Sequence, residues 1–206
     1  MLKITYFTVG MYETNCYVVW DEDTKNAVVI DPGDQCDDIQ AILENEGLTA
    51  GLILLTHGHF DHSGAVNALQ AATGAQVWLN KKDLEPDQSK GLLDPAGDYH
   101  FYDEGDTVTL DSMTFHVLST PGHTPGSVCL VMDQAIFAGD TLFSGSCGRT
   151  DFEGGSWEDM ERSLVRLSQL EGNYSVFPGH MEMTTLDRER QVNAFMRQAV
   201  ADLEGK

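Results

Sequence analysis

Four apolar segments of this chain each lead into a histidine or an aspartate that stands beside a glycine. The segments are residues 52–56, 113–118, 135–138 and 175–177, and the polar residues after them are His57, His123, Asp140 and His180. Short apolar runs bounded by turn residues are typical of buried strands. A chain with this repeated pattern is predicted to build sheets that carry polar side chains on their connecting loops.

The order of the predicted elements indicates how the sheets are covered. Further strands are expected within residues 1–31, 75–79, 106–110 and 127–132, and helices at 37–47, 61–73, 157–170 and 186–203. Residues 80–102 carry no clear pattern and are left unassigned. Each half of the chain therefore runs strands, helix, strand, helix. Two sheets packed face to face with helices outside would bury this pattern, which predicts an α/β (α+β) four-layer αββα sandwich. The length of 206 residues favours a single domain over residues 1–206.

Charge and cysteine usage narrow the class of protein. The chain has 12 Lys and Arg against 33 Asp and Glu, a formal net charge of -21. Such a chain repels phosphate backbones and anionic lipid, so we expect no nucleic-acid and no membrane partner. The four cysteines form no CxxC pair, and residues 1–10 lack the apolar core of a signal peptide. These features favour a reduced, cytoplasmic protein.

The strongest motif lies directly after the strand predicted at 52–56. Residues 57–62 read His-Gly-His-Phe-Asp-His. In an extended backbone His57 and His59 project to the same side, because side chains alternate with a period of two. Asp61 and His62 follow at the turn into a predicted helix and are placed to face the same space. Imidazole and carboxylate ligands suit zinc, iron or manganese, so this segment predicts a metal site.

The remaining candidate ligands come from the other strand ends. His123, Asp140 and His180 bring the set to five of the seven histidines and two aspartates. The other two histidines, His100 and His116, lie outside this context and are interpreted as ordinary loop and strand residues.

Taken together, this motif order resembles the metallo-β-lactamase superfamily, whose fold is the αββα sandwich. Residues 139–143 (Gly-Asp-Thr-Leu-Phe) and 148–152 (Gly-Arg-Thr-Asp-Phe) resemble the glyoxalase II branch and the related persulfide dioxygenases. The resemblance implies two metals. The first would be held by His57, His59 and His123, the second by Asp61, His62 and His180, and Asp140 would bridge both.

The leading hypothesis is an enzyme, a dinuclear-metal hydrolase of a small thioester such as a hydroxyacyl-glutathione. Two divalent cations, zinc first with iron or manganese as alternatives, would lower the pKa of a bridging water from 15.7 to about 7. The resulting hydroxide would attack the acyl carbonyl, and Asp61 would be the catalytic residue that orients it. A cysteine in place of Asp140 is absent, which disfavours lactamase activity.

Three alternatives stay open. A mononuclear iron dioxygenase acting on glutathione persulfide would use His57, His123 and Asp140, and the run at residues 147–152 supports it. The sequence Pro178-Gly179-His180 looks more like the hydrolase version of its loop. The second alternative is lactone or other ester hydrolysis at the same metal site. The third is a metal-binding module without catalysis.

Substrate recognition depends on weaker signals. Arg149 stands where glyoxalase II enzymes place a basic residue against glutathione, so it is predicted to bind the anionic end of the substrate. Asp151 stands where the full-length enzymes carry an aromatic contact. Only 26 residues follow His180, whereas those enzymes add a helical domain. We therefore expect an open, less selective pocket for a small-molecule thioester, and the sequence indicates no obligate protein partner.

Overall fold

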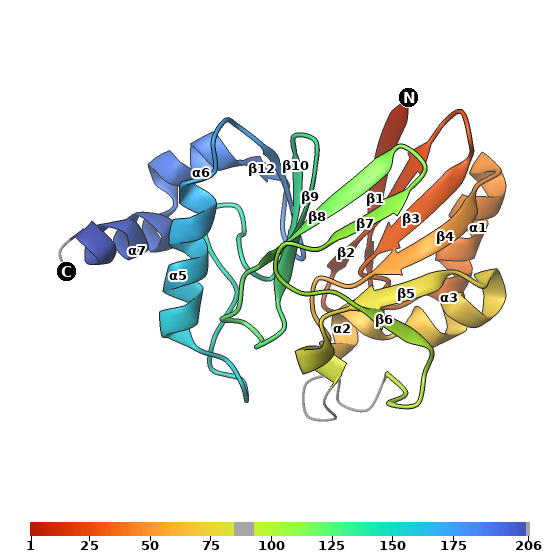
Figure 1. Ribbon diagram of the computed structural model, residues 1–206, viewed down its shortest axis with the longest axis horizontal. Helices are drawn as coiled ribbons and strands as arrows, with labels where there is room; N and C mark the ends of the chain where they lie inside the picture. The colour runs from red at the N-terminus through yellow and green to blue at the C-terminus, as the bar shows by residue number, and fades with distance from the viewer. Residues whose placement is uncertain (85–92, 205–206) are drawn as a thin grey trace.

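Two six-stranded β-sheets lie face to face in the computed structural model, which describes residues 1–84 and 93–204 (Figure 1). The strands of the first sheet are, in spatial order, β1 (Leu2–Val9), β2 (Thr14–Asp21), β3 (Asn26–Ile30), β4 (Thr49–Leu54), β5 (Gln76–Leu79) and β6 (Tyr99–Phe101). Those of the second are β12 (Thr184–Thr185), β11 (Ser175–Pro178), β10 (Ala135–Gly139), β9 (Val128–Met132), β8 (Met113–Ser119) and β7 (Thr107–Leu110). Strands β3 to β6 are parallel, as are β10 and β11.

Helices cover the outer face of each sheet, which confirms the predicted four-layer αββα sandwich (Figure 1). The helices α1 (Cys36–Glu46), α2 (Phe60–Ser63) and α3 (Val66–Thr73) belong to the first half, together with the 3-10 helix η1 (Lys81–Leu84). The helices α5 (Trp157–Ser168), α6 (Leu186–Val192) and α7 (Ala194–Glu204) belong to the second half. Within residues 1–84 and 93–204, no helix combines the length and the apolar character needed to cross a membrane.

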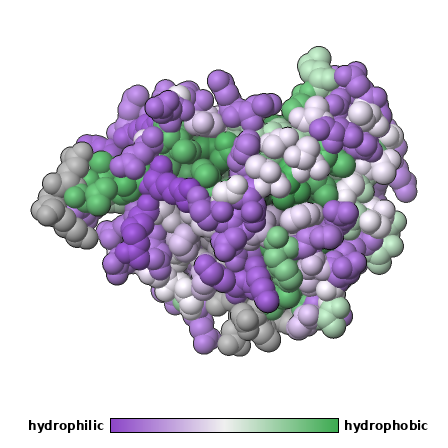
Figure 2. Space-filling view, in the orientation of Figure 1, coloured by the Kyte–Doolittle hydropathy of each residue, from purple (hydrophilic) through white to green (hydrophobic). Residues whose placement is uncertain are grey.

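The core between the two sheets is built from large apolar side chains. Tyr17 and Ile30 of the first sheet meet Phe115 and Phe137 of the second, and all four are fully buried. The opposite face of the first sheet packs against α1 and α3, so β3 is apolar on both faces. Figure 2 shows a mostly hydrophilic face, with a hydrophobic patch over α7 at the left of the view.

The helix predicted at 61–73 is wrong as a single element, because the structure divides it into α2 and α3. Its apolar period continues through the break, but the Ala65 amide donates to the carbonyl of Pro32 at 2.9 Å. That tertiary hydrogen bond replaces the intrahelical one. Asp61 and His62 therefore lie in a separate short helix, α2.

The helix predicted at 186–203 also divides, at Asn193, where the backbone is extended. The side-chain oxygen of Asn193 accepts hydrogen bonds from the amides of Phe195 and Met196 at 3.0 and 3.1 Å. Asn193 therefore caps the start of α7, a position at which asparagine is strongly preferred.

The unassigned stretch 80–102 contains ordered elements that the sequence pattern did not reveal. Its described residues include η1 and the edge strand β6, which pairs in parallel with β5; residues 85–92 lie outside the described part. The short edge strand β12 was not predicted either. Edge strands of two or three residues are too short to show periodicity.

Candidate metal centre

The seven candidate ligands gather at one end of the sandwich, because the parallel strands of both sheets end there. His57 and His59 follow β4, and Asp61 and His62 lie in α2. His123 lies in the loop between β8 and β9, Asp140 follows β10, and His180 follows β11. The other two histidines lie elsewhere. His100, interpreted from the sequence as a loop residue, lies in β6 and stacks on Trp78 of β5, and His116 is exposed on β8.

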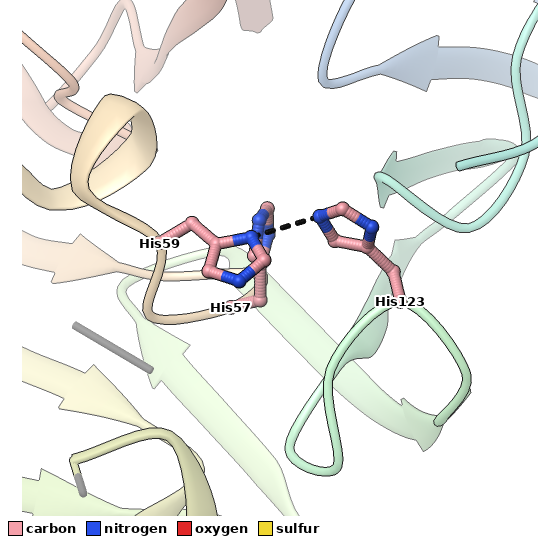
Figure 3. Close-up of side chains that lie close together, drawn as sticks. All are labelled: His57, His59 and His123. Atoms are coloured by element: carbon pink, nitrogen blue, oxygen red, sulfur yellow. Dashed lines mark hydrogen bonds between the residues drawn. The ribbon is translucent and has the colours of Figure 1, made fainter. Parts of the chain in front are cut away.

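Three imidazoles form what we call the first group: His57, His59 and His123 (Figure 3). Their ligand nitrogens lie within 4.8 Å of one another, and all three residues are buried. Nδ1 of His59 lies 2.9 Å from Nε2 of His123. His59 therefore points Nδ1 toward the centre of the group, whereas His123 points Nε2 toward it.

The second group consists of Asp61, His62 and His180, with ligand atoms again within 4.8 Å of one another. Oδ2 of Asp61 lies 3.4 Å from Nε2 of His180. Asp140 lies between the groups. Its Oδ2 is 3.3 Å from Nε2 of His123 in the first group, and its Oδ1 is 3.4 Å from Nε2 of His62 in the second. One carboxylate therefore faces both groups.

Hydrogen bonds on the outer nitrogens orient the rings. His62 Nδ1 lies 2.9 Å from Oδ2 of Asp31, and His123 Nδ1 lies 2.6 Å from the carbonyl of Arg149. His180 Nδ1 lies 3.1 Å from the carbonyl of Tyr12. Each acceptor fixes a proton on the outer nitrogen and leaves the inner nitrogen with a free lone pair, as a metal ligand requires.

The outer nitrogen of His57 also makes a hydrogen bond that fixes its proton, and the partner is a hydroxyl. Thr56 Oγ1 donates to Oδ2 of Asp31 at 2.7 Å, so its lone pair accepts from His57 Nδ1 at 3.2 Å. The inner nitrogen of His57 is then a lone-pair donor. Asp31 therefore supports one ring of each group: it contacts His62 directly and reaches His57 through the Thr56 hydroxyl.

Two atoms of the centre test whether a metal fits. Among the described residues, the buried side-chain atoms without a hydrogen-bond partner are His57 Nε2 and Asp140 Oδ1. An unpaired buried polar atom costs about 1–3 kcal/mol, and such atoms in a native protein call for a ligand or ion. Both atoms point into the cluster of imidazoles and carboxylates. The donor set therefore fits divalent metals of the zinc, iron and manganese type.

The electrostatics of the centre keep most donors ready to bind. Burial lowers the pKa of His57 well below its usual value and that of His59 to about 4, so both rings are neutral at pH 7. Burial opposes ionisation of Asp140, but the adjacent imidazoles, His62 first, hold the pKa of this carboxyl well below its usual range. His62 and His180 differ. Burial is outweighed at His62 by Asp140 and Asp31, and at His180 by Asp61 and Asp140, so the pKa of both rings is raised. A bound cation competes with those protons.

Comparison with known proteins identifies the fold family. The family description "Metallo-beta-lactamase superfamily" matches residues 9–180. This chain belongs to the metallo-beta-lactamase superfamily. It is 34% identical to the hydroxyacylglutathione hydrolase GloC of Haemophilus influenzae over 95% of this chain and 98% of that protein.

Solved structures of the superfamily agree closely with this one. The B3 metallo-beta-lactamase BLEG-1 has a TM-score of 0.85 and 33% identity, covering 94% of this chain and 99% of that one. ETHE1 from Myxococcus xanthus has a TM-score of 0.83 and 30% identity, covering 93% and 83%. TTHA1623, solved in a di-iron-bound form, has a TM-score of 0.81 and 36% identity, covering 93% and 99%. The superfamily fold binds divalent metals, and this chain carries His and Asp groups that could hold them.

The predicted substrate contact Arg149 lies at the rim of the metal centre. Its guanidinium makes two hydrogen bonds of 2.6 Å to Asp151 and lies 4.2 Å from the ring centre of Phe152. Phe152 in turn contacts the ring of His59, with 5.5 Å between ring centres. Arg149 supports the site through its carbonyl to His123, while substrate binding by its side chain stays a prediction.

Three contributors to the centre escaped the sequence analysis. Asp31 follows β3, and the sequence indicates only a strand end there. The carbonyl of Tyr12 orients His180, and backbone groups leave no sequence signal. Asp83, whose carboxylate accepts a hydrogen bond from the Gly58 amide, lies in the unassigned stretch. The one available signal was Asp31-Pro32-Gly33, since an aspartate after a buried strand fits the pattern of the other ligands.

Proposed function

We propose that this superfamily member is a two-metal hydrolase of small thioesters of the hydroxyacyl-glutathione type. The observation that carries the proposal is the place of the Asp140 carboxylate, which lies 3.3 Å from His123 of the first group and 3.4 and 3.6 Å from His62 and His180 of the second. The first group would hold one metal, the second group another, and Asp140 would contact both. The similarity to a hydroxyacylglutathione hydrolase along almost the whole chain supports the substrate class.

The chain's own residues would supply positioning and charge. Two bound divalent cations would supply Lewis acidity toward the acyl oxygen and would lower the pKa of a bound water. Asp61 is the candidate for orienting that water. Burial opposes its ionisation, but the hydrogen bond from His180 and the charge of His62 lower its pKa, so it is a carboxylate at neutral pH. Thr14 Oγ1 donates to Asp61 at 3.4 Å and restricts its rotation.

The leaving group makes modest demands on the protein. A thiol with a pKa near 8.5 leaves readily as its thiolate, so the mechanism needs no strong general acid from this chain. Arg149 at the rim is proposed to attract the anionic end of the thioester, and Phe152 would offer an apolar surface beside it.

Metal content per folded chain is the first experiment, with zinc, iron and manganese measured in protein purified without added metal or chelator. About two metals per chain, with turnover of hydroxyacyl-glutathione thioesters, would support the proposal. His59→Ala should then lose both first-group metal and turnover, because it removes one of three ligands. The matched control is His116→Ala, which changes an exposed histidine on β8. Full activity in His59→Ala would refute this mechanism.

A second candidate is oxidation of glutathione persulfide at a single iron. The run Cys147-Gly148-Arg149-Thr150-Asp151-Phe152 favours it, as does the 3.3 Å approach of His123 to Asp140. Close to one iron per chain, with oxygen consumed in the presence of a persulfide, would replace the hydrolase proposal. A β-lactam and a lactone belong in the same substrate panel, since one similar structure is a B3 lactamase.

A further inference from the structure

Asp83 is a fully buried carboxylate that joins the two loops of the first group. It lies in η1, and its Oδ2 accepts hydrogen bonds from the Gly58 amide at 2.9 Å and from Thr124 Oγ1 at 2.6 Å. Its Oδ1 accepts from the Gly126 amide at 2.8 Å. Gly58 stands between His57 and His59 of the first group. The other two donors, Thr124 and Gly126, lie in the loop that carries the third ligand, His123.

Gly58 and Gly126 have no side chain, and this leaves the space in which Asp83 packs against the two loops. A Cβ at position 58 would lie 2.4 Å from the backbone oxygen of Asp83, and a Cβ at position 126 would lie 2.5 Å from its Oδ1. Real Cβ atoms essentially never approach so closely. The glycine between the two histidines therefore serves the contact with Asp83, in addition to any effect on the loop conformation.

Other contacts hold Asp83 and its donors in place. The Asp83 amide donates to the Asn80 carbonyl at 3.0 Å, and Asn80 Oδ1 accepts from the Lys82 amide at 3.0 Å. The Thr124 amide donates to Ser127 Oγ at 3.1 Å, which fixes the loop beyond His123. All three groups that face the Asp83 side chain donate, so the position requires an acceptor-only side chain.

We propose that Asp83 is a positioning residue for the first group, coupling the loop of His57 and His59 to the loop of His123. The close approach of His59 to His123 depends on the relative placement of two loops 64 residues apart in the chain. Asp83 has direct hydrogen bonds to both. Within the part of the chain that the structure describes, its side-chain hydrogen bonds all go to these two loops, and His62 of the second group is oriented by Asp31 instead. Its effect on metal affinity is therefore selective for the first group.

This inference rests on the proposed function only in assigning a metal to the first group. Asp83→Asn tests it with a side chain of equal size. Its amide can still accept from Gly58 and Thr124 through the oxygen, but then its NH2 faces the Gly126 amide, another donor. We expect first-group metal affinity to fall at least about tenfold, the lower end of effects for residues that support metal ligands. Affinity at the second group should be unchanged.

Competitive chelator titration of the whole protein with zinc separates the two binding steps. The step weakened by Asp83→Asn should be the one that His59→Ala abolishes and that His180→Ala leaves in place, and Asp133→Asn, on an exposed turn, is the matched control. An equal loss at both steps would make Asp83 a general stabiliser, and no loss would remove its role altogether; either result overturns the proposal.

Amide hydrogen exchange of the metal-free protein supplies a readout that needs neither metal nor turnover. In Asp83→Asn the Gly126 amide should lose protection, together with the rest of the His123 loop, while the amides of β4 keep theirs. Thr124→Val is the milder second variant should Asp83→Asn fail to fold, and it should weaken the same metal step. Unchanged exchange and unchanged metal steps would overturn the proposal even if thioester hydrolysis is never observed. A wild-type chain that binds no metal would instead end the proposed function.

Discussion

Asp31→Asn is the sharpest single test of how the second group is oriented. Asp31 is 1% exposed and accepts three hydrogen bonds, from the Thr56 amide at 2.8 Å, from Thr56 Oγ1 at 2.7 Å and from His62 Nδ1 at 2.9 Å. The amide of asparagine keeps the shape but replaces one acceptor oxygen by a donor. One orientation of that amide sets its NH2 against the Thr56 amide. The other sets it against His62 Nδ1.

The second orientation changes the tautomer of His62. If the asparagine donates to Nδ1, the His62 proton moves to Nε2, the nitrogen that faces Asp140, and this nitrogen can no longer bind a metal. The first orientation keeps the correct tautomer but loses one buried hydrogen bond to a charged group, which is worth about 1.5–3 kcal/mol. Substitutions of such supporting residues weaken metal binding by about 10- to 100-fold. That loss corresponds to about 1.4–2.7 kcal/mol.

The assay is zinc titration against a competing chelator, combined with nitrogen-15 NMR of the histidine rings in the metal-free and loaded protein. We expect the step assigned to the second group to weaken by the range above and the first step to weaken less, because Asp31 reaches His57 only through the Thr56 hydroxyl. Asp133→Asn is again the control. Wild-type affinity in Asp31→Asn with an unchanged His62 tautomer would refute the reasoning that Asp31 sets the ring.

Three further predictions concern stability and specificity. Glu189 is buried, and although burial alone would raise its pKa, hydrogen bonds from Thr184, Gly145 and other donors lower it. Glu189→Gln should therefore lower the free energy of unfolding, measured with urea at pH 7, by about 1.5–3 kcal/mol. This loss should shrink as the pH falls below 4.5 through the folded pKa, and a pH-independent loss would contradict the reasoning. Phe137→Ala should cost about 3–5 kcal/mol in the same assay, because the ring is fully buried between the sheets, and a cost below 1 kcal/mol would refute that packing role. Arg149→Ala should raise KM for a glutathione thioester more than for an uncharged thioester and leave kcat little changed, and equal KM changes would show that the side chain does not bind the anionic end.

The candidate ligands could be predicted from sequence because each lies in a segment that follows a buried strand. Strand ends are local features, and the parallel arrangement brings them to one edge without further information. The seven residues at that edge therefore needed no knowledge of tertiary contacts. The sandwich followed from the same order of elements, since two sheets with apolar faces have few ways to be buried.

The helix boundaries could not be predicted in the same way. The apolar period continues across Ala65 and across Asn193, so a local reading favours one helix at each place. The breaks come from hydrogen bonds to distant residues, from Ala65 to Pro32 and from the Asn193 amide group to the carbonyl of Ser146. Periodicity reports which side chains are buried, and it carries no information on which backbone groups find partners elsewhere.

The orientation of the ligands required the same long-range information as the helix breaks. Asp31 and Asp83 each lie 25 residues from the loop they hold, the first before it and the second after it. Each is a buried carboxylate surrounded by donors: Asp83 holds the two loops of the first group, whereas Asp31 contacts His62 of the second group and reaches His57 through Thr56. Loops at a sheet edge are free to move relative to one another, so a site assembled from several of them needs fixed points that the strands do not supply. A sequence motif can therefore name the ligands of such a centre, whereas its geometry depends on acidic residues that look like ordinary surface charges until the fold buries them.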